Sequence, residues 1–397
     1  MDKETIDFIN SHSTEDIRKL ALHAVKYPNI DLPFALNQIS GIQTAKKKLP
    51  SWTSVNNIIY PPHLNMEQCS SEATARYKAQ LANKLSTQKN CLIDLTGGFG
   101  VDFSFMSANF NDATYVERNA ELCEIAKNNF KYLKIPHFTV VNGDGLNYLH
   151  DVKHTDIIFM DPARRNGNGG KVVALSDCTP NILTIKDELL EKADYVILKL
   201  SPMLDWHKAV GDLGSKNISE VHIISVDNEC KELLIVMSND ETEEFHFFCV
   251  DIQTKANSIF EYSSLDNPSP HKYSSNYKYL YEPNASIMKA GCFNILSERY
   301  EINQIAESSH LFISDKQIKD FPGRTFIISA ISSMNKKDMK QVFKGIEKAN
   351  IATRNFPLNV NELKKRLKIK DGGDIYIFAT TMEDKSHRLI ICKKIPL

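Results

Sequence analysis

The segment CLIDLTGGFGVDF, residues 91–103, carries the strongest chemical signal in the chain. Glycines in a turn after a strand let the backbone come close to a ligand. A Walker loop needs Lys followed by Ser or Thr after its glycines, and Val101 and Asp102 stand there instead. A dinucleotide-binding loop needs a third glycine, and Phe103 occupies that position. The sequence therefore excludes the Walker type of ATP site and disfavours NAD.

The turn resembles motif I of class I S-adenosylmethionine (SAM) methyltransferases, in which an acidic residue ends the first strand and glycines pass under the aminoacyl half of SAM. Asp94 ends the expected strand, and Thr96 stands where the family often has glycine. Gly98 and Gly100 match the G-x-G pattern. A carboxylate beside the turn, such as Asp102, suits the ammonium and sulfonium charges of SAM. The resemblance implies that these residues bind the cofactor.

Two further carboxylates follow the next two expected strands. Glu117 closes TYVE, where a carboxylate can accept hydrogen bonds from both ribose hydroxyls. Asp144, in NGDGL, stands where the family uses an acid to hold the adenine amino group. Each carboxylate alone would be read as a surface residue. Acids at three successive strand ends, the edge at which open α/β sheets bind ligands, predict a SAM site.

The fourth expected strand ends in DPARR, residues 161–165, which places Asp161 beside the cofactor and the transferring methyl group. Enzymes that methylate exocyclic amines typically have D/N-P-P-Y/F there, with the aromatic ring stacked on a flipped base. Ala163 and Arg164 replace the second proline and the aromatic residue, so an amine is not clearly the target.

Methylation at a pyrimidine C5 is a second option, because enzymes of that kind resemble DPPR in this segment. They also need a nucleophilic cysteine, and Ser201 and Pro202 occupy the expected position after the fifth strand. Cys178 could serve only if the loop before it folded back. This chemistry is therefore doubtful.

A third pattern fits better. Heat-shock-type ribose 2′-O-methyltransferases use Lys, Asp, Lys and Glu in that chain order, and this chain has Lys78, Asp161, Lys199 and Glu232 at the corresponding elements. The resemblance implies that Lys199, with a lowered pKa and oriented by the carboxylates, helps to deprotonate the 2′-hydroxyl. Lys199 is the most telling of the four, because a lysine between apolar residues at a strand end is costly unless it is functional or paired.

Arg164 and Arg165 are candidate substrate-binding residues, because arginine forks match phosphate oxygens bidentately. The alternative is that they pair with Asp177 or another carboxylate as a structural lid. The segment RRNGNGGK is glycine-rich and basic, which favours contact with a substrate.

The elements that must position these residues alternate from Cys91 onward. Short apolar segments separated by helical ones predict βαβ units and a mostly parallel sheet. The last two strands, VHIISV and ELLIVM, have no room for a crossover helix and predict a hairpin. The expected fold class is α/β: a Rossmann-like class I methyltransferase with a seven-stranded sheet, a terminal antiparallel hairpin, a helical N-terminal region and small α+β C-terminal modules.

Four segments are expected along the chain: a helical region at 1–88, a SAM-dependent methyltransferase domain at 89–240, a ferredoxin-like segment at 241–325 and a THUMP-like domain at 326–397. In the first, Thr14 is the expected N-cap of an amphipathic helix. In the third, PNASIMKAGCFNILSERY is read as one helix.

Composition narrows the setting of the protein. Residues 326–397 hold fifteen Lys or Arg against seven Asp or Glu, a candidate surface for a polyanion, although a solvated helix face explains part of it. No apolar run approaches the roughly 20 residues of a membrane helix. The N-terminus is acidic, and the eight cysteines form no CxxC pair and no readable metal site, so we expect a cytoplasmic protein without a metal.

Several segments together, LPSW, YPPHLNMEQCSSEATARYKA, DLTGGFGVDF, DPARR, LKLSPMLD and YEPNASIMKAG, resemble a bacterial group of class I methyltransferases. Its members carry a ferredoxin-like segment and then a C-terminal THUMP-like domain. The resemblance covers nearly the whole chain and implies a SAM-dependent methyltransferase of rRNA or tRNA. Alternatives are a SAM-binding regulatory or scaffold protein, or a methyltransferase of a protein or small molecule. Oligomeric state cannot be read from the sequence.

Overall fold

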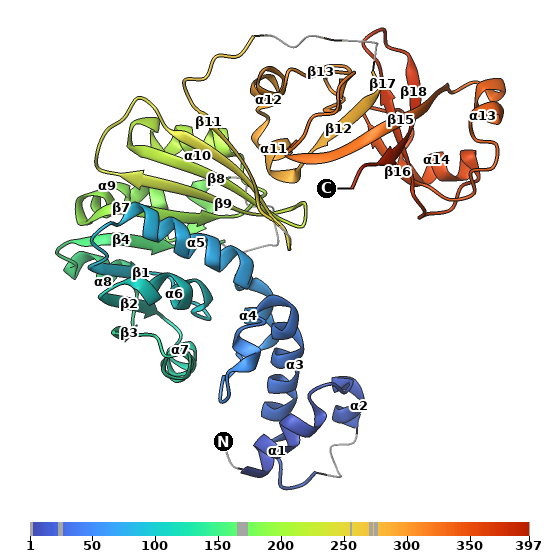
Figure 1. Cartoon of the computed structure of the whole chain (residues 1–397). Helices are drawn as coiled ribbons and strands as arrows, with labels where there is room; N and C mark the ends of the chain where they lie inside the picture. Colours follow the sequence, from blue (N-terminus) through green and yellow to red (C-terminus); the bar gives the residue numbers. More distant parts are fainter. Residues whose placement is uncertain are drawn as a thin grey trace. The chain divides into compact units, whose positions relative to one another are not determined.

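A computed structural model describes residues 3–22, 27–164, 174–254, 256–269, 273 and 277–396 (Figure 1). The chain divides into two compact units. The first comprises Met1–Val221 and Lys231–Phe245, and the second comprises His222–Cys230 and His246–Leu397. Within the described ranges, no helix is long and apolar enough to cross a membrane.

The first unit begins with the expected helical region: α1 (Lys3–His12), α2 (Ile17–Leu22), α3 (Leu32–Lys48), α4 (His63–Gln68) and α5 (Glu72–Leu85). The Ser71 hydroxyl caps α5 by accepting a hydrogen bond from the Thr74 amide at 3.3 Å. The expected N-cap at Thr14 is wrong. Thr14 lies in a turn, and the Asp16 carboxylate accepts from the Arg18 amide at 2.8 Å at the start of α2.

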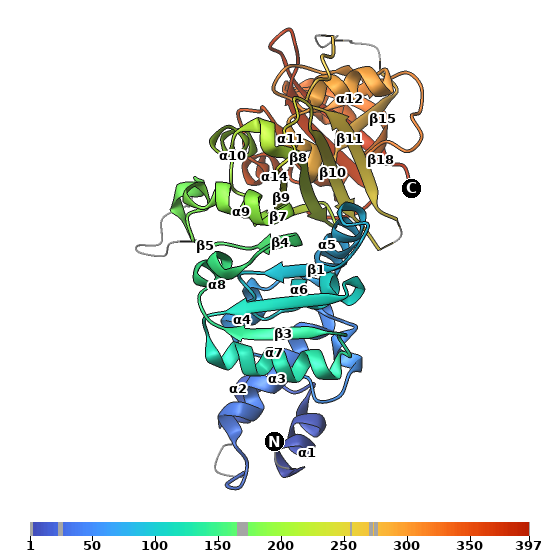
Figure 2. The same ribbon diagram turned by 90° about the vertical axis from the view of Figure 1, so that its left-hand side faces the viewer.

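The expected strands follow: β1 (Cys91–Asp94), β2 (Asp112–Glu117), β3 (Phe138–Asn142), β4 (Thr155–Met160), β7 (Ala193–Leu200), β8 (Ile218–Val226) and β9 (Glu229–Ser238). Their order is β3-β2-β1-β4-β7-β9-β8. The first five pair in parallel, and β9 runs antiparallel to β7. This confirms the Rossmann-like sheet with its antiparallel ending, and it brings the carboxyl ends of β1 to β4 and β7 to one edge (Figure 2).

Helices connect these strands: α6 (Val101–Met106), α7 (Ala120–Tyr132), α8 (Gly145–Asp151), α9 (Lys186–Lys192) and α10 (Trp206–Leu213). α6 packs against α5, which joins the N-terminal helices to the sheet domain. One pairing was not predicted: β5 (Ala163–Arg164) runs antiparallel to β6 (Cys178–Thr179), with Arg164 opposite Cys178. The segment after β4 therefore does fold back.

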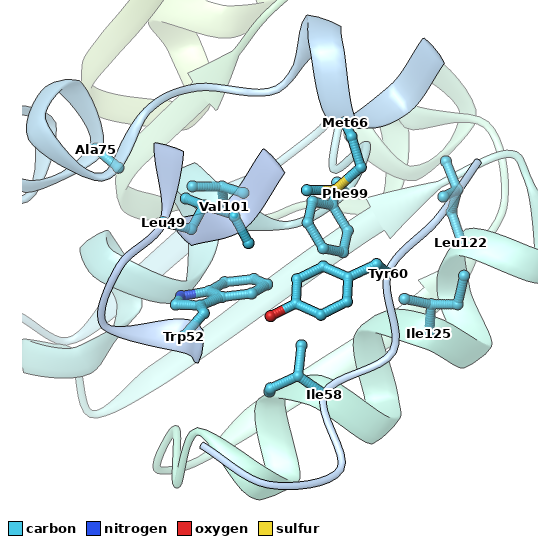
Figure 3. Packing of buried hydrophobic residues seen from close by; sticks show 11 residues of the cluster. Leu49, Trp52, Ile58, Tyr60, Met66, Ala75, Phe99, Val101, Leu122 and Ile125 are labelled. Carbon is cyan, nitrogen blue, oxygen red and sulfur yellow. The ribbon is translucent and has the colours of Figure 1, made fainter. Parts of the chain in front are cut away.

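A buried apolar cluster fixes the N-terminal segment against the glycine turn (Figure 3). Trp52 is 1% exposed and meets Phe99 of the turn edge-on, with ring centroids 5.2 Å apart. Tyr60 lies beside the same ring at 6.4 Å. Leu122 and Ile125 of α7 close the cluster from the other side. The conformation of the turn thus depends on residues 49–66 as well as on its own glycines.

The strands β10 (His246–Ile252) and β11 (Ser258–Ser263) pair in antiparallel fashion and continue the first sheet beyond β8. Among the described residues this sheet therefore has nine strands, two more than the seven expected from the sequence. A separate seven-stranded sheet has the order β13-β14-β12-β15-β18-β17-β16. Its strands are β12 (Tyr279–Pro283), β13 (Asn303–Gln304), β14 (Phe312–Ser314), β15 (Gly323–Ser333), β16 (Asn350–Arg354), β17 (Ile375–Thr381) and β18 (His387–Lys394).

The described residues of the second unit also form the helices α11 (Ala285–Ala290), which contacts β10, α12 (Phe293–Tyr300), α13 (Lys336–Val342) and α14 (Val360–Leu367). The single helix expected over PNASIMKAGCFNILSERY is wrong. Gly291 has φ +72° and ends α11 in the left-handed conformation, so that α12 begins afresh at Phe293.

Removal of the Trp52 side chain tests the packing of the glycine turn. Trp52→Ala should lower the free energy of unfolding by about 3–5 kcal/mol, because it leaves a cavity beside Phe99. Urea unfolding followed by far-UV circular dichroism measures the change. The matched control is Leu22→Ala, at a side chain that is 82% exposed, where the change should stay within about 0.5 kcal/mol. Equal losses in the two variants would contradict this assignment.

Candidate active site

The glycine turn, residues 95–100, carries the chain from the end of β1 into α6. Gly98 and Gly100 have φ of +56° and +80°, a region that favours glycine. A side chain at Gly97 would put its Cβ 2.2 Å from the Tyr115 ring, and one at Gly100 would lie 2.7 Å from Phe130. At Gly98 the nearest atom, the Thr96 carbonyl oxygen, would be 3.8 Å away, so of these three glycines only Gly98 has room for a Cβ.

Glu117, at the end of β2, holds this turn in place. Its two carboxylate oxygens accept hydrogen bonds from the Gly98 and Asn119 amides, each at 2.8 Å. The Tyr115 hydroxyl donates a hydrogen bond to the Gly98 carbonyl. Each oxygen of Glu117 keeps further acceptor capacity. The carboxylate is therefore fixed at the strand end where the sequence predicts a ribose contact.

Asp144 is placed differently from Glu117. It caps α8 by accepting hydrogen bonds from the Leu146 and Asn147 amides at 2.8 and 3.2 Å, and it forms an ion pair with Arg118. Burial acts to raise the pKa of this carboxyl, but the amides and the Arg118 charge outweigh it and lower the pKa. Of this segment, Gly145 and Leu146 line the cavity described below, whereas Asp144 is outside its lining.

Asp94 is the most deeply buried of the three strand-end carboxylates, at 1% exposure. It accepts from the Thr96 amide at 2.9 Å, and the Thr96 hydroxyl oxygen in turn accepts from the Asp161 amide at 2.7 Å. Burial raises the pKa of Asp94 to about 8, and the nearby Asp102 and Asp161 charges act in the same direction. Thr96 thus links the ends of β1 and β4.

A cavity of about 760 Å³ lies at these strand ends. Its lining includes Asp94, Thr96, Gly98, Gly100, Asp102, Glu117, Asp161 and Lys199. The N-terminal region also contributes, through Asn65 and Gln68 of α4 and through Cys69 and Ser70 in the connection to α5. In the sequence analysis this segment contributes only to the family resemblance, and none of these cavity residues is named there. Three of the four, Gln68, Cys69 and Ser70, lie in the stretch EQCSSEATARYK before the glycine turn, but nothing in that stretch distinguishes a cavity wall from the start of a helix.

The four residues of the Lys-Asp-Lys-Glu pattern lie in one charged cluster with Asp102. Lys199 Nζ donates to Asp161 Oδ2 at 2.6 Å and lies 3.5 Å from Asp102 Oδ2. Lys78 Nζ forms ion pairs with Glu232 and, at 3.1 Å, with Asp102 Oδ1. Asp161 and Lys199 reach the cavity, while Lys78 and Glu232 are outside its lining as far as the described residues show.

The charge of Lys199 differs from the expectation. Burial lowers the pKa of this lysine, but attraction to Asp161, Asp102 and Glu232 outweighs burial and raises the pKa well above its ordinary value of 10.5. The lowered pKa implied by the family resemblance is therefore wrong for this state of the protein. Lys199 is an ammonium held against the Asp161 carboxylate.

The expected substrate-binding arginines are placed only in part. The Arg164 backbone belongs to β5, and Arg165 lies outside the described residues. Cys178, opposite Arg164, is 3% exposed and lines the cavity. Cys178 could take part in C5 methylation only if the segment before it folded back. The pairing of β5 with β6 meets this condition. Among the described residues no group of three or more His, Cys, Asp or Glu side chains could hold a metal.

Two family models match the C-terminal part of the chain: a ferredoxin-like domain at residues 279–322 and a THUMP-like domain at residues 323–394. The crystal structure of a candidate methyltransferase from Porphyromonas gingivalis W83 is similar over 100% of both chains, with 28% identity and a TM-score of 0.86. These findings confirm the resemblance, drawn from the sequence, to class I methyltransferases with two such C-terminal modules.

Other solved structures are similar to part of the chain only. A SAM-dependent methyltransferase from Agrobacterium tumefaciens covers 43% of this chain and 63% of its own, at 18% identity and a TM-score of 0.32. A candidate RNA methyltransferase from Pyrococcus horikoshii covers 48% of this chain and 96% of its own, at 15% identity and a TM-score of 0.37. No curated protein matches the chain.

Asp94→Asn tests the burial of the strand-end carboxylate. The pKa of Asp94 is about 8 in the folded protein, against 3.8 for an ordinary Asp. The folded state therefore binds more protons between these values, and the wild type loses stability as pH rises from about 4 to about 8 but not above pH 8. The asparagine variant carries no such group. Its free energy of unfolding should therefore gain on the wild type by about 1.4 kcal/mol per pH unit across this window and level off above pH 8. Urea titrations at a series of pH values measure the difference, and a constant difference would refute the assignment.

Proposed function

We propose that the protein is a SAM-dependent methyltransferase that methylates a hydroxyl group of RNA, with the ribose 2′-hydroxyl of rRNA or tRNA as the acceptor. The observation that carries the proposal is the Lys199–Asp161 pair at 2.6 Å in the wall of the cavity at the strand ends. Catalysis of methyl transfer to a hydroxyl needs a proton acceptor and a cation at the oxygen, and this pair supplies both.

The cavity suits SAM in size and in its donor set. Its volume of about 760 Å³ falls within the roughly 300–1,000 Å³ of ligand pockets. Gly98 leaves space where a side chain would stand, and Glu117 presents acceptors that suit the ribose hydroxyls. Asp94, whose pKa is raised to about 8, would become ionised beside the cationic groups of SAM and then balance their charge, whereas Asp102 lines the cavity but is already engaged by Lys78 and Lys199. Asp144 would reach the adenine only by giving up its ion pair with Arg118, whose side chain is 57% exposed.

When bound, SAM supplies an electrophilic methyl group. The Asp161 carboxylate, 42% exposed, would accept the hydrogen bond and then the proton of the acceptor hydroxyl. The Lys199 ammonium would stabilise the negative charge that develops on the oxygen, a role that the raised pKa of Lys199 favours and that a neutral lysine could not fill.

The choice of RNA as substrate rests on the C-terminal part of the chain. Residues 326–397 carry a surplus of eight positive charges, fifteen minus seven, and most of them lie within the match to the THUMP-like model. Cationic side chains supply most of the affinity of proteins for phosphate backbones. The proposal keeps the four segments expected from the sequence, with Arg164 and Arg165 contacting the substrate, and a cytoplasmic location.

The nature of the methylated product tests the proposal. The protein is incubated with isotope-labelled SAM and RNA from cells that lack its gene, and the digested nucleosides are identified by mass spectrometry. We expect a 2′-O-methylated nucleoside, reduced at least a hundredfold by Lys199→Ala and by Asp161→Asn, since both remove groups at the reacting oxygen. SAM binding by each variant is measured alongside to separate chemistry from cofactor loss.

Cys178→Ser is the matched control, because Cys178 also lines the cavity. It should leave formation of the product within about twofold of wild type. A methylated base whose formation is lost in Cys178→Ser would replace the ribose reading with C5 chemistry. Bound SAM without transfer to any RNA would favour a protein or small-molecule substrate, or a regulatory protein.

A further inference from the structure

Asp102 was expected to contact the cofactor, but its two carboxylate oxygens contact two different lysines. Oδ1 lies 3.1 Å from Lys78 Nζ, and Oδ2 lies 3.5 Å from Lys199 Nζ. Oδ2 also accepts a hydrogen bond from the Ser70 hydroxyl at 2.6 Å. One carboxylate therefore stands between a lysine in the cavity wall and a lysine with no exposed surface.

The buried side of this cluster is closed from solvent. Lys78 is 0% exposed and Glu232 is 5% exposed. A buried ammonium requires opposite charges close by, and Lys78 has Glu232 and Asp102. Ser70 completes the group: its hydroxyl oxygen lies 3.3 Å from Lys78 Nζ and 3.3 Å from Glu232 Oε1. Neither Lys78 nor Glu232 lies in the described lining of the cavity, so neither can meet a substrate directly.

We propose that Asp102 is a positioning residue that couples the buried Lys78–Glu232 pair to Lys199, so that the charge of Lys78 influences methyl transfer through Asp102. The inference rests on the proposed function in placing the reaction at Lys199 and Asp161. It goes beyond that proposal in dividing the Lys-Asp-Lys-Glu set into two residues at the cavity and two behind them.

The charges around Lys199 set the direction of each expected change. Lys199 faces Asp161 at the end of β4, Asp102 on α6, Glu232 on β9 and the thiol of Cys69 after α4. Asp94 lies close to both Asp102 and Asp161. Removal of the Asp102 charge should make the ammonium of Lys199 easier to deprotonate. Removal of the Lys78 charge should make it harder, because the charge of Asp102 is then no longer shared.

Competitive labelling of lysines with trace acetic anhydride, followed by peptide mass spectrometry, reports the charge of Lys199 in the full-length protein without any substrate. In Asp102→Asn, labelling of Lys199 at pH 9 should rise roughly tenfold, the factor that corresponds to one pKa unit. In Lys78→Met it should fall, and in Ser70→Ala, which keeps every charge, it should rise by less than in Asp102→Asn. The control is Asp212→Asn, at a carboxylate paired with Lys208 on α10, where labelling should not change.

The double variant Lys78→Met/Asp102→Asn decides whether the coupling passes through Asp102. Labelling of Lys199 should then equal that of Asp102→Asn alone. An unchanged labelling curve in folded Asp102→Asn, or a full effect of Lys78→Met in the Asp102→Asn background, would overturn the inference. Should Lys78→Met not fold, Asp102→Asn and Ser70→Ala still decide it.

Activity separates this inference from the proposed function. Asp102→Asn should lower kcat at least tenfold and leave KM for SAM within about threefold. It should also move the alkaline limb of the pH–rate profile to lower pH. Asp102→Glu, which keeps the carboxylate, should restore part of kcat. A shifted labelling curve in a protein that transfers no methyl group would leave the coupling standing and reject the proposed function. An active enzyme whose Lys199 labelling ignores Asp102 would reject the coupling alone.

Discussion

A lysine without solvent exposure, Lys78, is the constraint on which the site depends. An ammonium in this position is stable only if carboxylates from other parts of the chain reach it. Those carboxylates are Asp102 of α6 and Glu232 of β9, 24 and 154 residues further along the chain. The ion pairs therefore tie the N-terminal helical region to the first and last parts of the sheet domain. The glycine turn lies between these anchored elements.

The charged groups around Asp102 give the cavity two ionisable side chains, Asp94 and Lys199, whose pKa values are both raised. The raised pKa favours the neutral form of Asp94 and the charged form of Lys199. Asp94, buried among other acids, has its pKa raised and is held partly neutral near pH 8. Lys199, surrounded by three acids, has its pKa raised and remains a cation. Asp94 ends β1 and Lys199 stands one residue before the end of β7, with β4 between the two strands. Under the proposed function, the acid would face the cationic methyl donor and the fixed cation would face the developing oxyanion.

The sequence predicted the sheet well because its signals are local. The glycines at Gly98 and Gly100 and the alternation of apolar segments depend on near neighbours, and strands that alternate with helices predict parallel pairing. Thr14 and Asp16 are both suitable N-cap residues, and the spacing of the apolar residues cannot distinguish them. In the structure Asp16 is the residue that accepts from a helix amide. The break at Gly291 was missed because a glycine inside a helical pattern can equally be tolerated.

The roles of the charged residues could be predicted only in part. The Lys-Asp-Lys-Glu set converges as expected, but Asp102 faces the two lysines and Asp144 is engaged by Arg118. The direction of the pKa shift at Lys199 depends on three carboxylates contributed by separate elements. Such balances of burial against charge are properties of the folded arrangement and leave no mark in local spacing.

Calorimetric titration of SAM into the purified protein tests the central claim most directly. The account predicts one SAM bound per chain, displaced by S-adenosylhomocysteine, with proton release that is greatest below pH 8 and absent in Asp94→Asn, since a cationic ligand beside Asp94 favours its ionised form. A protein that binds neither SAM nor S-adenosylhomocysteine, although folded, would contradict the assignment of the cavity.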